Sequence, residues 1–409
     1  MNFLNIESEE QFNSIKYVTL FIIVSYTFSF LIRMIWIYQF QDNPSFLWND
    51  QLMINTNDGY YFASAAQHLL NSMHDANPQI PIALKNYPGV IYVTALATKL
   101  LPFSLETVIL YLPAVISSLV VIPIILTTRL FGLPLLGFFA ALLGSIAWSY
   151  YNRTMVGYYD SDMFSVLMQM MVVYSFISLL VQHRYSNIIL AFVFITFYPL
   201  FYPQGLSLIY AMYFIYLAYV YFTTKDDKIT YLSIAVIAVA LAPLSIPLKL
   251  VLGIALLLLY RFDKIALKQW MFIAALAFLF YLFNANVFGL IYEKIFGYFS
   301  RGTETEGLAF YQVIQTVREA GQIPFSTMAN RISGSTFGVI IALIGYLFLA
   351  FKYRPFIIAL PLIGVGVFSL VGGLRFTVYA VPIAAVSAIF LFYIMTQSII
   401  IKKLRYGII

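Results

Sequence analysis

Residues 107–128, TVILYLPAVISSLVVIPIILTT, contain no charged side chain and are long enough to cross a bilayer as one helix. Similar runs recur along most of the 409-residue chain, in which 62% of residues are hydrophobic and only 10% are charged. Such a composition cannot supply a water-facing surface. The sequence therefore predicts an integral membrane protein and excludes most soluble enzyme classes.

The length of these runs predicts an all-α fold, a polytopic transmembrane helical bundle, because β-barrel strands are shorter and alternate. Hydropathy predicts about twelve spans. They lie at 17–39, 106–128, 133–150, 163–182, 186–201, 205–222, 229–244, 247–260, 269–289, 336–351, 355–371 and 375–400. Pro243 and Pro247 leave open whether 229–260 is one long segment or two short ones.

The distribution of Lys and Arg orients the bundle, since cytoplasmic loops are enriched in both. With the N-terminus inside, the short inner loops hold twelve of these residues and the short outer loops hold three. The inner set is Arg129, Arg184, Lys225, Lys228, Arg261, Lys264, Lys268, Lys352, Arg354, Lys402, Lys403 and Arg405, and the outer set is Arg153, Lys249 and Arg375. Both termini are therefore expected in the cytoplasm. The net charge of +6 reflects this orientation and indicates no nucleic-acid partner.

The segment before the first span carries Glu7, Glu9, Glu10 and Lys16, unlike the basic n-region of a signal peptide. We therefore expect the first span to be an uncleaved anchor. The chain has no cysteine, which excludes disulfides, thiolate metal ligands and cysteine nucleophiles.

Two outer loops are long, at 40–105 and 290–335, and connections of this size are often functional. In the first, the amphipathic stretch 58–73 predicts a short helix at the membrane interface. In the second, the polar stretch 301–307 is bounded by glycine and is expected to be mobile.

Eleven of the seventeen acidic residues fall on the predicted outer side, where they outnumber the bases. Asp160 and Asp162 are separated by one residue, so an extended loop could direct both at one cation. Asp58 opens the predicted helix of the first loop and could instead be its N-cap. Glu319 could simply belong to a solvated loop.

Two further residues are placed on the outer side by the topology. Arg375 begins the last span, and its planar guanidinium suits a phosphate, although it could be a snorkelling anchor. Tyr202 lies at an outer turn and could be an ordinary interfacial aromatic residue.

Six motifs occur in the order and spacing of one protein family. They are Asn-Asp-Gly-Tyr (57–60), Ser-Tyr-Tyr-Asn-Arg-Thr-Met (149–155), Gly-Tyr-Tyr-Asp-Ser-Asp-Met (157–163), Gln-Thr-Val-Arg-Glu (315–319), Arg-Ile-Ser-Gly-Ser (331–335) and Gly-Gly-Leu-Arg-Phe-Thr (372–377). In these motifs the chain resembles the catalytic subunit of oligosaccharyltransferase, most closely the bacterial single-subunit form. The resemblance implies a transmembrane domain of GT-C type over residues 1–409. It also implies transfer of a preassembled oligosaccharide from a polyprenyl-pyrophosphate carrier to Asn in the sequon Asp/Glu-x-Asn-x-Ser/Thr.

The resemblance also implies a metal-dependent active site. Asp58, Asp160 and Glu319 would hold a divalent metal, Mn²⁺ or Mg²⁺, with Asp162 and Arg153 completing the site. Asp58 and Glu319 would also face the acceptor amide as catalytic acids, and Arg153 would be a third catalytic residue that supports the site. These roles are carried over from the family motifs.

The implied substrates are the lipid-linked oligosaccharide and an acceptor polypeptide. Arg331 would pair with the acid two residues before the acceptor Asn, whereas Arg375 and Tyr202 would lie near the carrier pyrophosphate. The expected location is a bacterial inner membrane, among its lipids, with the active site on the periplasmic face.

The resemblance covers the membrane domain alone. Family members continue through one more span into a large outer domain carrying Trp-Trp-Asp-Tyr-Gly, and no such motif occurs in this sequence. We therefore predict that this polypeptide alone binds carrier and metal but glycosylates poorly or not at all. A non-functional or split fragment of the enzyme is an open alternative.

Two other functions stay open. Another GT-C transferase that moves a sugar from a polyprenyl phosphate would share the outer acids and the bundle. A transporter would place its charges near the membrane midplane, whereas here they gather at one edge.

Overall fold

Helices make up nearly all of the regular structure in the computed structural model, which describes residues 9–73, 76–223, 227–299 and 318–396. The α-helices are α1 (Ile15–Phe40), α2 (Asn57–Asn71), α3 (Gln79–Asn86), α4 (Pro88–Leu100), α5 (Leu105–Ser118), α6 (Val121–Arg129), α7 (Pro134–Ile146), α8 (Trp148–Tyr151), α9 (Asp162–Gln182), α10 (Tyr185–Phe201), α11 (Leu206–Thr223), α12 (Lys228–Leu241), α13 (Ile246–Arg261), α14 (Leu267–Asn284), α15 (Val287–Phe299), α17 (Phe325–Ser333), α18 (Thr336–Lys352), α19 (Leu360–Gly372) and α20 (Thr377–Met395). The 3₁₀ helices are η2 (Glu10–Phe12), η3 (Pro44–Phe46), η4 (Pro203–Gly205), η6 (Arg318–Ala320), η7 (Arg354–Ala359) and η8 (Leu374–Phe376). Strands β1 (Leu47–Trp48) and β2 (Gln51–Leu52) pair antiparallel. The all-α prediction is confirmed.

Each of the twelve predicted spans coincides with one or two of these helices. Within the described ranges, seven helical stretches are long and apolar enough to cross a membrane, and the bent pair α17–α18 would make eight. The seven are Ile15–Phe40, Leu105–Arg129, Asp162–Gln182, Pro203–Thr223, Leu267–Asn284, Arg354–Gly372 and Leu374–Met395. The chain is thus a multi-pass membrane protein, while the number twelve stays a prediction.

Local sequence explains where several helices begin and end. The stretch 229–260 forms two helices, α12 and α13, with Pro243 in their connection. Ser104 accepts a hydrogen bond from the Thr107 N–H at 3.2 Å and so caps α5. Gly334, with φ of +81°, ends α17, and α18 then turns away by 73°.

The long outer loops are more helical than predicted. The helix expected at 58–73 is confirmed as α2, but α3, α4 and the hairpin were not predicted. Helix α15 begins inside the predicted span 269–289 and continues into the second loop, where α17 also forms without having been predicted. The stretch 301–307 lies outside the described residues.

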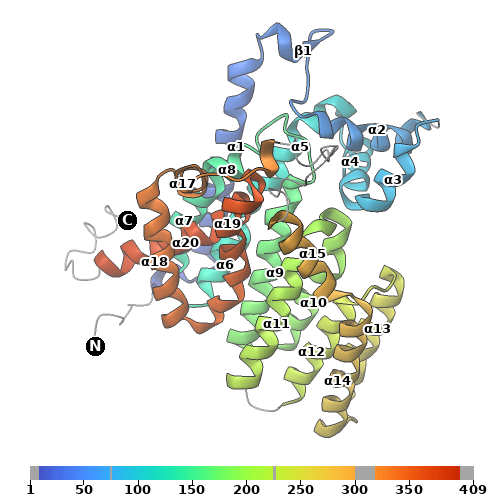
Figure 1. The fold of residues 1–409 in the computed structure, drawn as a ribbon, viewed down its shortest axis with the longest axis vertical. Coiled ribbons are helices and arrows are strands. Elements are labelled where there is room, and N and C mark those ends of the chain that lie inside the picture. The colour runs from blue at the N-terminus through green and yellow to red at the C-terminus, as the bar shows by residue number, and fades with distance from the viewer. Residues whose placement is uncertain (1–8, 74–75, 224–226, 300–317, 397–409) are drawn as a thin grey trace, which may run out of the picture.

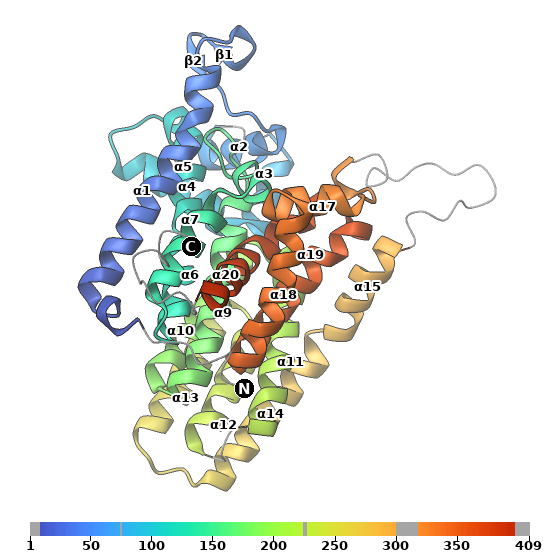
Figure 2. The same cartoon turned by 90° about the vertical axis from the view of Figure 1, so that its left-hand side faces the viewer.

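The loop elements gather at one end of the bundle. Figures 1 and 2 show α2–α4, α8 and α17 at the end that carries β1, whereas α12–α14 extend to the opposite end. Helices α9 and α20 form the core, since nearly every side chain of α20 is buried. By contrast, α1 and α14 bury few of their side chains and leave most apolar ones partly or fully exposed, as lipid-facing helices do.

Candidate functional site

A cavity of about 510 Å³ lies among the loop elements at this end of the bundle. Seven of the eight predicted site residues line it, although they come from distant parts of the sequence. They are Asp58, Arg153, Asp160, Asp162, Tyr202, Glu319 and Arg375. The four predicted metal-site acids therefore face one cavity, while Arg331 is not among its lining residues.

Asp58 reaches the cavity because α2 packs closely on the loop that carries Asp160. Helix α2 begins at Asn57, so Asp58 lies in its first turn and is not the N-cap. The next residue, Gly59, is buried, and a Cβ there would lie 2.7 Å from the Tyr159 carbonyl oxygen. Only glycine permits this approach, which explains the Asp-Gly pair in the first motif.

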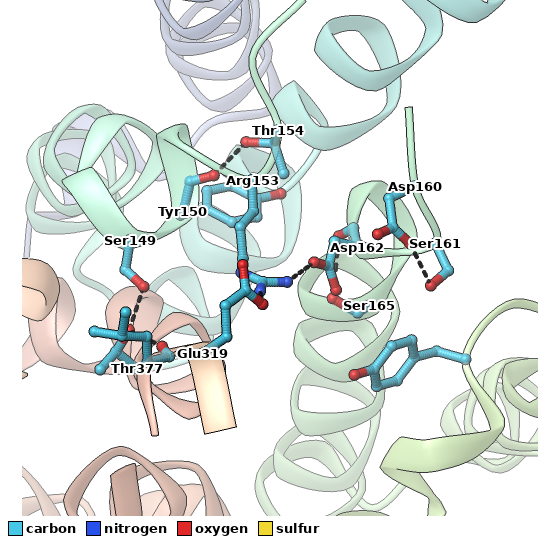
Figure 3. A network of polar contacts seen from close by, with 12 residues as sticks. Ser149, Tyr150, Arg153, Thr154, Asp160, Ser161, Asp162, Ser165, Glu319 and Thr377 are labelled. Carbon is cyan, nitrogen blue, oxygen red and sulfur yellow. Dashed lines mark hydrogen bonds and ion pairs between the residues drawn. The ribbon is translucent and has the colours of Figure 1, made fainter. Parts of the chain in front are cut away.

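Arg153 bridges two of the acids, as Figure 3 shows. Its Nη1 donates to Asp162 Oδ2 and its Nη2 to Glu319 Oε2, which places one fork donor on each carboxylate. Only 8% of Arg153 is exposed. Burial lowers the pKa of Arg153, but Asp162 and Glu319 raise it well above its ordinary value. The arginine thus stays charged and holds both acids in place.

Asp160 lacks such a partner. It is half-buried and accepts a hydrogen bond from Ser161 Oγ at 3.0 Å. Burial, together with the charge of Asp162, raises the pKa of Asp160 to about 7. A cation beside this carboxylate would reverse that shift.

Glu319 is held by the backbone around Gly373. Gly373 has φ of +95°, and a Cβ at this position would clash with the Glu319 carbonyl oxygen. The Ile323 N–H also donates to the Leu370 carbonyl at 3.2 Å. The glycine pair before Leu374 therefore allows the Glu319 segment to lie against α19 and η8.

Arg375 and Tyr202 lie on the wall of the cavity. The Arg375 Nε is buried and has no hydrogen-bond partner among the residues described. Arg375 is among the residues that line the cavity. The Tyr202 hydroxyl is hydrogen-bonded to the Tyr379 hydroxyl of α20.

Arg331, on α17, lies close to this wall without lining the cavity. Its Nε donates to Thr377 Oγ1 at 3.4 Å. Thr377 is also hydrogen-bonded to Ser149 and follows Arg375 by two residues (Figure 3). Thr377, the first residue of α20, therefore contacts Arg331, and the cavity residue Arg375 lies two positions before it.

The cavity also has an apolar wall, which the sequence did not indicate. We call this wall the apolar end and the part with the acids and arginines the charged end. Helices α11, α15 and α19 supply Leu208, Ala211, Ile291, Pro361, Gly364, Val365 and Phe368. Near the acids, Ser161, Gln204 and Ser207 add neutral polar groups, and the Gln204 amide donates to the Tyr87 hydroxyl. Within long hydrophobic runs, cavity-lining and lipid-facing side chains look alike, so no sequence signal separates them.

By charge and ligand type, the carboxylates that line the cavity could hold a divalent cation. In the described part of the chain, no three His, Asp or Glu side chains are already arranged around one point. Arg153 lies between Asp162 and Glu319, which keeps these two acids on its fork. Nevertheless, the lining has four carboxylates and two arginines, so two negative charges stay unbalanced when all are ionised. Carboxylate oxygens are the ligands that Mg²⁺ and Mn²⁺ prefer.

Comparisons with known proteins identify the family of the chain. Residues 25–406 match the family model described as Oligosaccharyl transferase STT3, N-terminal. Undecaprenyl-diphosphooligosaccharide–protein glycotransferases from two strains of Campylobacter jejuni are 34% identical over 397 residues. This alignment covers 95% of the chain and 55% of each relative, so the chain spans about half the length of these relatives.

Solved structures share the fold. The Archaeoglobus fulgidus oligosaccharyltransferase in its apo form aligns with a TM-score of 0.62 at 16% identity, covering 96% of this chain and 52% of that one. The archaeal enzyme AglB in complex with an inhibitory peptide and a dolichol-phosphate gives the same TM-score and coverage at 17% identity. The family match extends over nearly the whole sequence, and the chain therefore belongs to the STT3 oligosaccharyl transferase family.

Proposed function

We propose that this chain forms the active centre of an oligosaccharyltransferase. It would transfer a preassembled oligosaccharide from a polyprenyl-pyrophosphate carrier to the side-chain amide of Asn in Asp/Glu-x-Asn-x-Ser/Thr. The observation that carries the proposal is the mixed lining of the cavity, in which carboxylates and arginines share one space with an apolar wall from α11, α15 and α19. A pyrophosphate joined to a hydrocarbon tail likewise combines a charged group with an apolar one.

The carrier would bind along the length of the cavity. Its tail would lie against the apolar faces of α11 and α19, where burial of each methylene contributes about 0.8 kcal/mol. Arg375 would donate its free Nε–H to the pyrophosphate, with Tyr202 beside it. The reactive sugar carbon would then lie near Asp58 and Glu319.

The acceptor amide is a poor nucleophile, because its nitrogen lone pair is delocalised into the carbonyl group. Asp58 and Glu319 would accept its two N–H groups, which favours a polarised or twisted amide, and one of them would take the proton. Arg331, beside the cavity wall, would pair with the acidic residue two positions before the Asn.

The proposed divalent metal, Mn²⁺ or Mg²⁺, would be held by Asp58, Asp160 and Glu319, with Asp162 as a supporting acid, and would supply Lewis-acid stabilisation of the leaving pyrophosphate. Arg153 would hold the carboxylates of Asp162 and Glu319 in position for that role. The negative lining supports this assignment.

We further propose that the protein lies in a bacterial inner membrane with both termini in the cytoplasm and the cavity at the periplasmic face. The distribution of Lys and Arg supports this orientation. The absence of cysteine makes it testable, because a single cysteine at Tyr60 or at Arg184 can be labelled with an impermeant maleimide in intact cells.

The decisive experiment uses the chain in lipid nanodiscs with a polyprenyl-pyrophosphate oligosaccharide and a fluorescent Asp-x-Asn-x-Thr peptide. Single-turnover conditions with excess protein over long times detect even slow transfer. We expect a glycopeptide with the glycan on Asn and none with Gln in its place. Transfer to a lipid or free glycan would support another GT-C transferase, and carrier flux without bond cleavage would support a transporter.

A further inference from the structure

Arg33 is a fully buried cation in α1, the first spanning helix. None of the carboxylates in the described part of the chain pairs with it. A buried charge inside a membrane bundle is costly, and such residues usually serve a function. The cavity residues do not include Arg33.

The guanidinium of Arg33 connects α1 to the segment before Asp160. Its Nη1 donates to Ser29 Oγ at 2.6 Å and to the Ser29 carbonyl at 3.1 Å. Its Nε donates to the Thr154 carbonyl at 3.1 Å, and its Nη2 to Thr154 Oγ1 at 2.9 Å. The guanidinium carbon also lies 5.1 Å from the centre of the Tyr150 ring. Arg33 thus fixes Thr154 by both its backbone and its side chain.

Helix α5 completes this anchor. The Tyr150 hydroxyl donates to the Ser117 carbonyl at 2.8 Å, and Thr154 Oγ1 donates to the Tyr150 carbonyl at 2.5 Å. Ser118 Oγ is hydrogen-bonded to Ser29 Oγ at 3.1 Å. Two spanning helices therefore clamp residues 150–154 through a buried polar network.

Arg153 lies inside the clamped segment, next to Thr154. In Figure 3 the Thr154 and Tyr150 side chains lie on one side, while the Arg153 guanidinium points away from them toward Glu319 and Asp162. Neighbouring side chains on this tight turn face different ways, so holding Thr154 also fixes the direction of Arg153.

We infer that Arg33 is a positioning residue for the proposed transfer reaction. It anchors Thr154 so that Arg153 can hold Asp162 and Glu319 in the geometry that the reaction needs. Three arginine hydrogen bonds to one residue make the anchor specific, because a Lys ammonium lacks the planar fork. The inference rests on the proposed function for its kinetic consequence, but the anchoring itself can be measured without substrate.

The first test is hydrogen exchange followed by mass spectrometry on the chain in nanodiscs. Arg33→Met removes the fork at similar volume, and Thr154→Val removes its hydroxyl acceptor without touching the charge. Both variants should raise exchange in peptides covering 150–160 by about tenfold, with α18–α20 unchanged. Ser25→Ala is the matched control, because Ser25 is buried on the same helix and its Oγ has no partner in the described structure. Wild-type exchange at 150–160 in both variants would overturn the inference.

The second test is the kinetic split between binding and turnover. Arg33→Met should lower kcat for transfer by about tenfold to a hundredfold and leave the KM for the carrier unchanged, because Arg375 and the apolar end are intact. Arg33→Lys should recover part of the loss, and Ser25→Ala should match the wild type. An increase in KM with unchanged kcat would contradict positioning. If exchange rises as expected but the wild-type protein neither binds the carrier nor transfers its glycan, the anchor stands and the proposed function fails.

Discussion

The two ends of the cavity are built in different ways. The charged end takes each of its residues from a turn, a 3₁₀ helix or the first turn of a helix, as with Asp58, Arg153, Glu319 and Arg375. The apolar end is made by side chains of α11, α15 and α19. Irregular backbone can aim polar groups at one point, but it needs anchors such as Gly59, Gly373 and Arg33's network. Regular helices need no such anchors, and the apolar wall that they form should tolerate substitution.

The largest effect is expected at the proposed catalytic acids. Glu319→Gln keeps an oxygen for the hydrogen bond from Arg153 but removes the negative charge, as does Asp58→Asn for its own carboxylate. Each should lower transfer by about 10²–10⁴-fold, since general acid–base groups contribute on that scale. Carrier affinity, measured by equilibrium binding of a fluorescent analogue, should not change. Full activity in both variants would rule out their proposed role.

Metal removal should have a comparable effect. Treatment with EDTA should stop transfer, and Mn²⁺ or Mg²⁺ should restore it, because the cavity lining has excess negative charge. Binding can be measured independently as an increase in thermal stability on adding Mn²⁺, which Asp160→Asn should reduce. Undiminished activity in protein shown to be metal-free by elemental analysis would contradict the metal assignment.

Gly373→Ala should come next. The new Cβ would clash with the Glu319 carbonyl in a backbone of positive φ, so Glu319 must move. We expect transfer to fall about 10²-fold, as displacement of a catalytic group by about 1 Å does. Gly334→Ala is the matched control, because Gly334 has a similar φ of +81° but open space around its Cβ. Equal losses in the two variants would show that backbone strain, and not the contact with Glu319, is responsible.

The same contrast explains what the sequence could predict. Hydropathy located helices in all twelve ranges, because each spanning helix carries its own signal. The motifs identified six residues that line the cavity, since charged residues are conspicuous in an apolar chain, and the topology added Tyr202. The Arg153 bridge, Arg33's network and the apolar wall from α19 depend on tertiary packing between distant segments. No local pattern encodes such packing, so these features became visible only in the structure.

Substitution of Arg375 should weaken carrier binding more than substitution of the apolar wall. Arg375→Leu removes a charged hydrogen-bond donor, and such bonds contribute about 1.5–3 kcal/mol, so affinity should fall roughly tenfold to a hundredfold. Arg375→Lys should lose less, because it keeps the charge without the fork. Arg184→Leu, which removes an exposed arginine on the predicted cytoplasmic side, is the control. Equal carrier affinity in Arg375→Leu and the wild type would show that the pyrophosphate does not bind at Arg375.

The smallest effect is expected at Gly364, on the α19 face that lines the cavity with Pro361 and Phe368. A Cβ at Gly364 would meet no atom within 4 Å, so Gly364→Leu can extend into open space without disturbing the helix. If the carrier tail lies there, the new side chain displaces one or two methylene contacts at about 0.8 kcal/mol each, which lowers affinity roughly four- to fifteenfold. A water-soluble pyrophosphate sugar without the tail should bind both proteins equally. Gly297→Leu, on α15 and also in open space, lies outside the cavity lining and should have no effect. A loss for both ligands would mean that α19 itself had shifted, whereas no loss for either would place the tail elsewhere and leave only the charged end as the carrier site.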